Sequence, residues 1–370
     1  MFHRNTIKSV GSFQLEQSIA QICYICPVEN RNVTIHTIAA RLNLSASTVS
    51  RALAGNTRIS QKTRDQVNAT AGEMNYKPNT LASNLRKGKG NLIGVIIPRI
   101  NRHFFSHAIA GMETITNPNG YNLMICQTNE DAQSEIESLQ TLINNRADGI
   151  IMSISIGSIN DDHVRSALKQ GVPVVLFDRV YNHLNIDQVV NDNFSGGYQA
   201  TKHLLDQGYK NIVHFAGPLH INVYADRCNG YKKAMLDAGI EVTGSMVYEN
   251  VLTRKGGEEI TQQFIDKGEI PDAIFSASDF SALGALLLLK KNGISIPERV
   301  GICGFANEPF TELTEPGMTT SEQFSEEIGK SAARMLIQRI TNNKNSELSS
   351  SISFNPKLII RGSSLKNKNK

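Results

Sequence analysis

Residues 34–53 read TIHTIAARLNLSASTVSRAL and contain two short helix patterns separated by one asparagine. From Ile35 onward, four apolar residues recur at i, i+3, i+4 and i+7, which predicts one buried helical stripe. Asn43 tolerates the left-handed conformation that a tight corner needs, and Ser45 is a suitable N-cap for the second helix. Helices this short are marginal alone in water, so we expect them to pack on each other.

A third helix pattern follows the first two. Ser60 is a second N-cap, Val67 and Ala71 lie on the apolar face, and Pro78 ends the run. Three short helices with a sharp turn between the first two predict a helix-turn-helix domain.

Charge is distributed unevenly along the 370 residues, whose net charge is +4. Residues 33–90 contain nine basic and two acidic side chains, whereas residues 91–370 carry an excess of acids. A basic module joined to an acidic body predicts a polyanion partner for the basic end. The composition, 40% hydrophobic and 19% charged, is that of an ordinary globular protein. The longest apolar runs are too short to cross a bilayer, so we expect no membrane association.

The five cysteines are scattered, which does not predict a disulfide framework and fits a reducing cytoplasm. Cys23 and Cys26 have half the spacing of a zinc site, but no second pair completes it. The first residues faintly resemble a signal peptide, but Gln21 interrupts the apolar part and no small-residue cleavage site follows. We therefore expect a cytoplasmic protein.

From Asn91 onward, short apolar runs alternate with amphipathic segments of helical length. Runs that are apolar at every position predict strands buried on both faces, as in a parallel sheet covered by helices. Their number suits two stacked, doubly wound α/β lobes. Ligands of such folds bind at the carboxyl ends of the strands. The runs are LIGVIIP, YNLMICQ, DGIIMSIS, VPVVLFD, QVVND, NIVHFAGP, DAIFSAS, RVGICGF and KLIIRG.

No motif predicts catalysis, a metal or a cofactor. His103 and His107 have the i, i+4 spacing of metal ligands, but no third ligand accompanies them. Ser195 lacks the flanking residues of a nucleophile elbow, and no phosphate-binding loop occurs.

The sequence resembles the LacI/GalR (lactose-repressor) family of bacterial transcription regulators over roughly residues 33–364. The segments that follow the family pattern in order are VTIHTIAARLNLSASTVSRAL, RISQKTRDQV, MNYKPNTLASNLRKGKGNLIGVIIP, VVNDNFSGGYQATKHLLDQGYKNIVHFAGP, DRCNGY, SASDFSALGAL and EPGMTTSEQ. Residues 1–32 have no counterpart, and we expect the true start to lie later, at Val28 if its codon is GTG.

The resemblance implies a helix-turn-helix domain, a hinge helix and a body of two lobes that resembles periplasmic sugar-binding proteins. The predicted boundaries are 33–78 for the helix-turn-helix, 79–90 for the hinge and linker, 91–364 for the body and 365–370 for a tail. Within the body, we expect one lobe at about 91–187 plus 322–346 and the other at about 188–321 plus 347–364.

The second helix of a helix-turn-helix enters the major groove of DNA with its N-terminal residues. Ala46 suits a thymine methyl, Ser47 suits a donor or an acceptor, and Arg51 suits guanine O6 and N7. A phosphate contact is the alternative for Arg51. The remaining candidates in this domain would cap a helix or contact phosphates of the DNA backbone, namely Thr34, Ser45, Thr48, Ser50 and Arg58.

Residues 78–88, PNTLASNLRKG, resemble the hinge helix of the family. In the family, two such helices enter the minor groove together. Leu85 matches the leucine that wedges between base pairs, and Ala82 matches the small residue that lets the helices approach. Asn79 is a candidate for contacts to groove edges or phosphates. An ordinary buried leucine is the alternative for Leu85.

In the family, an arginine and two carboxylates in the cleft between the lobes bind the effector. By motif these are Arg227, Asp279 and Asp178, and Gln323 matches a further cleft residue. An arginine fork with carboxylates suits the hydroxyls of a sugar. Phe104 and Phe105 follow the first strand, where one of them could stack on a sugar face and the other belong to the core. For Asp192 we favour a structural role, as the cap of the following helix.

The sequence therefore predicts a homodimeric, effector-responsive DNA-binding regulator, more specifically a repressor of a near-palindromic operator. A periplasmic solute-binding receptor is the alternative. It explains the α/β body but requires export and gives the basic module no role. We expect no enzyme, because no nucleophile and base converge.

Overall fold

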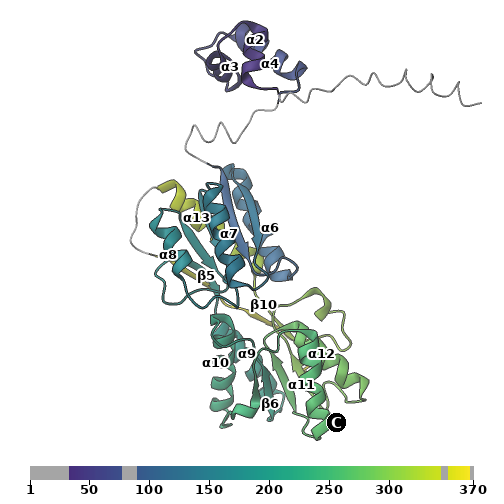
Figure 1. Cartoon of the computed structure of the whole chain (residues 1–370). Helices are drawn as coiled ribbons and strands as arrows, with labels where there is room; N and C mark the ends of the chain where they lie inside the picture. Colours follow the sequence, from purple (N-terminus) through teal and green to yellow (C-terminus); the bar gives the residue numbers. More distant parts are fainter. Residues whose placement is uncertain (1–32, 77–89, 343–348, 367–370) are drawn as a thin grey trace, which may run out of the picture. The chain divides into compact units, whose positions relative to one another are not determined.

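The computed structural model describes residues 33–76, 90–342 and 349–366 (Figure 1). The chain divides between Ser83 and Asn84 into two compact units. Three of the predicted DNA contacts, Asn79, Ala82 and Leu85, lie outside the described residues, as does the leader, residues 1–32. No helix among the described residues is long and apolar enough to span a membrane.

The first unit is a three-helix cluster of α2 (Ile35–Leu42), α3 (Ala46–Leu53) and α4 (Gln61–Glu73). The structure confirms the three local signals. Asn43 is left-handed with φ of 52°, the Ser45 side chain accepts a hydrogen bond from the Thr48 N–H at 3.1 Å, and Ser60 accepts from the Thr63 N–H at 3.2 Å. The predicted apolar stripes form the core, in which Ile38, Ala39, Val49, Ala52, Val67 and Ala71 are buried.

The first lobe of the second unit is a six-stranded parallel sheet in the order β11-β5-β4-β3-β1-β2 (Figure 1). Its core clusters place α6 and α13 on one face and α7 and α8 on the other. The elements are β1 (Leu92–Ile97), α6 (His103–Thr116), β2 (Asn122–Gln127), α7 (Ala132–Asn144), β3 (Gly149–Met152), α8 (Asp162–Lys169), β4 (Val174–Phe177), β5 (Asp187–Asn191), α13 (Ser325–Asn342) and β11 (Ser351–Phe354).

The second lobe is a four-stranded parallel sheet in the order β7-β6-β8-β9. Helices α9 and α10 cover one face, and α11 and α12 cover the other. The elements are α9 (Asn193–Asp206), β6 (Ile212–Phe215), α10 (Asn222–Asp237), β7 (Val247–Tyr248), α11 (Arg254–Lys267), β8 (Ala273–Ser276), α12 (Asp279–Lys291) and β9 (Gly301–Cys303). Short 3-10 turns occupy Asn117–Asn119, Gly244–Met246 and Pro309–Thr311.

The chain crosses between the lobes three times, and two of the crossing segments pair as the antiparallel strands β10 (Thr320–Glu322) and β12 (Lys357–Ile359). The second lobe was predicted to start at about residue 188 and to resume at about residue 347. Both boundaries are wrong, because β5 and β11 belong to the first sheet. Strand β11 pairs in parallel with β5, with Ile352 beside Val189. It is an edge strand with mostly exposed side chains, so it has no apolar run that would reveal it.

Candidate functional site

The polar start of α3 is organised by hydroxyl groups. The Ser45 Oγ lies 2.9 Å from the Ser47 Oγ and 2.8 Å from the Thr48 Oγ1, in addition to capping the helix. Thr34 caps α2 in the same way, within a reciprocal pair with Thr37. The predicted capping role of Ser45 is therefore confirmed. DNA contacts by these residues stay predictions.

Two arginines of the first unit have guanidinium groups without a partner among the described residues. Arg51 and Arg58 are exposed, and within the described chain their guanidinium groups make no hydrogen bond and no ion pair. Arg41 differs, since it pairs with Glu73 at 3.1 Å. Arg51 lies one helical turn after Ser47 on α3, so the two share a face. Ser50 and Ala46 are half-buried beside this face, which presents donors and positive charge but no carboxylate.

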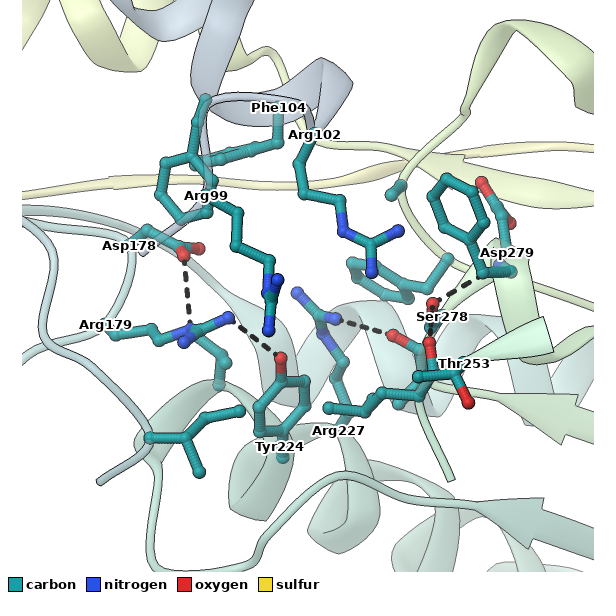
Figure 2. A pocket seen from close by; sticks show the side chains of 18 of the residues that line it. Arg99, Arg102, Phe104, Asp178, Arg179, Tyr224, Arg227, Thr253, Ser278 and Asp279 are labelled. Atoms are coloured by element: carbon teal, nitrogen blue, oxygen red, sulfur yellow. Dashed lines mark hydrogen bonds and ion pairs between the residues drawn. The ribbon is translucent and has the colours of Figure 1, made fainter. Parts of the chain in front are cut away.

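The second unit contains a cavity of about 440 Å³ with walls from both lobes (Figure 2). The residues that line it come largely from the segments just after the carboxyl ends of β1, β2, β4, β8 and β9, where ligands of such sheets bind. All six predicted effector residues line this cavity, namely Phe104, Phe105, Asp178, Arg227, Asp279 and Gln323. Their role in binding stays a prediction.

Arg227, on α10, holds the centre of the second-lobe wall (Figure 2). Its guanidinium donates to the Asn193 Oδ1 at 2.8 Å, to the Ala277 carbonyl at 2.9 Å and to the Gln323 Oε1 at 2.9 Å. It also lies 3.8 Å from the centre of the Phe305 ring. Burial lowers the pKa of Arg227 to about 10, so the group is still charged near neutral pH.

Asp279 is the first residue of α12 and is completely buried. Its carboxylate accepts hydrogen bonds from the Thr320 hydroxyl at 2.7 Å and from the Glu308 N–H at 2.9 Å. A Cβ atom at Gly304 would lie 2.1 Å from this carboxylate, so the position requires glycine. Burial raises the pKa of Asp279 to about 7, although these hydrogen bonds oppose the rise.

The first-lobe wall carries a charged cluster after β4. Asp178 is left-handed with φ of 60°, and burial raises the pKa of its carboxyl group. Its Oδ2 lies 3.9 Å from the Arg179 Nε. Arg179 donates to the Glu130 carboxylate at 2.7 Å and to the Tyr224 hydroxyl of the other lobe at 3.1 Å. This cluster therefore links the two lobes across the cavity.

Both phenylalanines after β1 line the cavity and belong to the core. Phe104 and Phe105 are buried and pack on Phe177, with ring centres 6.5 and 6.0 Å apart. The structure therefore does not single out one of them as a stacking platform. Asp192 caps α9, accepting from the Ser195 N–H at 2.8 Å, so its favoured structural role is confirmed.

Nine charged or polar residues of the cavity are absent from the sequence-based site, namely Arg99, Arg102, Glu130, Arg179, Tyr224, Asn250, Thr253, Ser278 and Glu308. Arg99, Arg102, Glu130 and Arg179 follow β1, β2 or β4 within five residues. Their positions just after strands predict a place at the ligand site, but the family motifs do not include these residues. The His103 and His107 rings lie 3.8 Å apart, and no group of three candidate metal ligands exists within the described ranges.

Comparison with known families identifies both units. The model of bacterial regulatory proteins of the lacI family matches residues 34–79. The model of periplasmic binding proteins and the sugar-binding domain of the LacI family matches residues 91–361. Catabolite control protein A of Priestia megaterium is 31% identical over 82% of this chain and 92% of its own length. The ribose operon repressor of Haemophilus influenzae is 31% identical, with 84% and 92% covered.

Solved structures share the fold of this chain. The lac repressor dimer bound to operator and an anti-inducer has a TM-score of 0.80 at 23% identity, covering 91% of this chain and all of that one. At this identity the likeness concerns the fold alone. The transcriptional regulator CelR in complex with cellobiose has a TM-score of 0.68 at 26% identity, with 90% and 99% covered.

Proposed function

This chain belongs to the LacI family of bacterial regulatory proteins, and we propose that it is a homodimeric repressor controlled by a sugar or sugar derivative. As a member of this family, it binds DNA and regulates transcription under the control of a small-molecule effector. The proposal adds the dimer, the repressor activity, the class of effector and the residues of both sites.

The single observation that carries the effector site is that six residues from distant parts of the chain line one cavity between the lobes. Arg227 supplies a fixed fork of donors, while Asp178 and Asp279 supply acceptors for hydroxyl groups. Because a ligand here would contact both lobes, it would favour one relative arrangement of the lobes over others. Coupling of this kind between two sites is typically worth about 1–3 kcal/mol.

For the operator, the proposal assigns base contacts to the exposed face of α3, with Ala46, Ser47 and Arg51. Arg58 and the hydroxyl residues around Ser45 would contact phosphates. Asn79, Ala82 and Leu85 are proposed minor-groove residues on the strength of the family resemblance. Two copies of the chain would match a near-palindromic operator, because a twofold dimer reads two half-sites.

A periplasmic receptor is disfavoured by the first unit. Arg51 on α3 and Arg58 after it are exposed and have no acidic partner among the described residues, which gives them no role in a transport receptor but suits DNA phosphates and bases. Since the operator lies on the chromosome, we infer that the protein acts in the cytoplasm. We also infer that it regulates rather than catalyses, as its curated relatives do.

The decisive experiment measures binding of the full chain to labelled fragments from upstream of its own gene, with a scrambled duplex as reference. Arg51→Ala should weaken binding to the specific fragment by about 1–3 kcal/mol per half-site, or roughly 5- to 150-fold, because a bidentate guanine contact is lost. Arg41→Ala is the matched control. It removes the same charge from the same unit at a side chain already paired with Glu73.

The two variants should lose equal affinity for the scrambled duplex. An Arg51→Ala loss that is equal on both duplexes would show a phosphate contact instead of a base contact. Failure of the unmodified chain to bind any fragment at low ionic strength, with or without sugars, would refute the proposed function itself.

A further inference from the structure

The cavity contains four arginines, and their surroundings differ. Arg179 forms a short ion pair with Glu130, at 2.7 Å. Arg227 donates only to neutral oxygen atoms. The other two, Arg99 and Arg102, come from the loop between β1 and α6 and reach into the cavity from the first lobe (Figure 2). A sugar without charge would need no such pair.

The side chain of Arg102 has no bonded partner among the described residues, and its acidic neighbour Glu308 interacts with it only through its charge. Within the described residues its guanidinium makes no hydrogen bond and no ion pair, and it does not cap α6. Instead it lies 4.1 Å from the centre of the Phe280 ring on the opposite lobe. Partial burial lowers the pKa of Arg102, so the positive charge is held at a cost in this position. A half-buried guanidinium with all its donors free is ready for an acceptor from outside the chain.

Arg99 has only a distant acidic partner among the described residues. Its nearest carboxylate is that of Glu130, whose Oε1 lies 3.9 Å from the Arg99 Nε. The other oxygen of Glu130 is already bonded to Arg179. One carboxylate therefore serves two arginines, and Arg99 keeps donors available on a side chain that is 43% exposed at the cavity.

The acids of the cavity leave the donors of Arg99 and Arg102 largely unbonded. Asp279 is occupied by the Thr320 hydroxyl and the Glu308 N–H. Burial raises the pKa values of Asp178, Asp279 and Glu308. The lining carries four arginines and four carboxylates, and the guanidinium donors that remain available to a ligand lie on the loop that holds Arg99 and Arg102.

We propose that the effector is an anionic sugar, whose carboxylate or phosphate is bound by Arg102 and Arg99 while its hydroxyls face Arg227 and Asp279. This inference rests on the proposed function, because it names the class of effector for the same cavity. The planar guanidinium fork binds carboxylates and phosphates through two parallel hydrogen bonds. Opposite walls would thus recognise opposite ends of one ligand.

The test uses calorimetry to compare the affinities of the full chain for several sets of matched ligands. Each set contains a neutral hexose, its hexuronate and aldonate, and its 6-phosphate, so that the carboxylate and phosphate sources are separated. We expect one anionic member to bind at least about tenfold more tightly than its neutral parent. Arg102→Gln and Arg99→Gln should each weaken that ligand about tenfold or more and leave the neutral parent unchanged.

Arg165→Gln is the control, since it removes the same charge from the surface of the same lobe, where Arg165 pairs with Asp161. It should bind every ligand as the unmodified chain does. Tighter binding of a neutral sugar, together with a changed affinity for DNA, would overturn this inference and leave the proposed function intact. If no member of any set binds, both the inference and the proposed effector class fail, whereas specific binding to the promoter fragment would still support a repressor.

Discussion

Arg51 and Arg58 of the first unit and Arg227 of the second unit lie in opposite environments. In the first unit, Arg51 and Arg58 are exposed and have no partner for their side chains among the described residues. In the second unit, Arg227 is buried and makes three hydrogen bonds. An exposed charge in water needs no partner and remains available for a polyanion. A buried charge must be satisfied, so it becomes part of the fold.

The largest expected effect is the loss of folding stability when the buried Arg227, rather than an exposed arginine, is replaced. Arg227→Ala leaves Asn193, Gln323 and the Ala277 carbonyl without their donor, and each unsatisfied buried group costs about 1–3 kcal/mol. We expect a loss of about 3–6 kcal/mol in the free energy of unfolding of the second unit, measured by urea denaturation.

Arg51→Ala, at an exposed surface position, should change the free energy of unfolding by less than about 0.5 kcal/mol. Similar losses in the two variants would contradict the distinction between the units. Arg227→Lys refines the test, because it keeps the charge and removes the planar fork.

Local signals were enough to predict the first unit from the sequence. Asn43, Ser45 and Ser60 act within a few residues of their own positions, and the apolar stripe from Ile35 onward has a single period. Eight of the nine apolar runs form strands of the two parallel sheets, as predicted. The ninth, KLIIRG, forms β12, which pairs antiparallel with β10 and is not buried, so its predicted place in a parallel sheet is wrong. The edge strand β11 has no such run and was missed.

The cavity depends on contacts between distant residues, and local patterns do not contain them. Arg227 meets Gln323 across 96 positions of the chain and meets Asn193 across 34. The family motifs predicted that Arg227, Asp279 and Asp178 belong together. They did not predict that Arg102 reaches Phe280 on the other lobe, because this pair depends on how the two lobes close around the cavity.

The second prediction concerns Asp279, a buried acid of the second unit whose ionised form is destabilised by burial. Burial raises the pKa of Asp279 to about 7, above the ordinary value of about 3.9. Between about pH 4 and pH 7 the unfolded chain loses this proton while the folded chain keeps it. The contribution of Asp279 therefore favours the folded state below about pH 4, declines as the pH rises to about 7, and is constant above that.

The decline should be on the order of 4 kcal/mol, since the shift spans about three pKa units and each is worth about 1.4 kcal/mol. Asp279→Asn should abolish this pH dependence in urea titrations at several pH values, whatever constant offset it introduces. Asp131→Asn is the control with the opposite sign, because hydrogen bonds from Ser134 lower the pKa of the exposed Asp131. An unchanged pH profile in Asp279→Asn would show that the acid is ionised in the folded chain throughout this range.

The smallest expected effect is a change in the salt dependence of DNA binding when an exposed arginine of the first unit is replaced. Arg58→Gln should reduce the slope of log K against log salt by about 1.8 for the dimer, because each of the two subunits loses one phosphate contact and each contact releases about 0.9 counterions. Arg64→Gln should have a smaller effect, since the Arg64 guanidinium already donates to the Asn56 carbonyl at 3.1 Å. Binding of both variants to specific and scrambled duplexes at several salt concentrations would measure this. A loss for Arg58→Gln confined to the specific duplex would place Arg58 at a base edge and assign it the role proposed for Arg51.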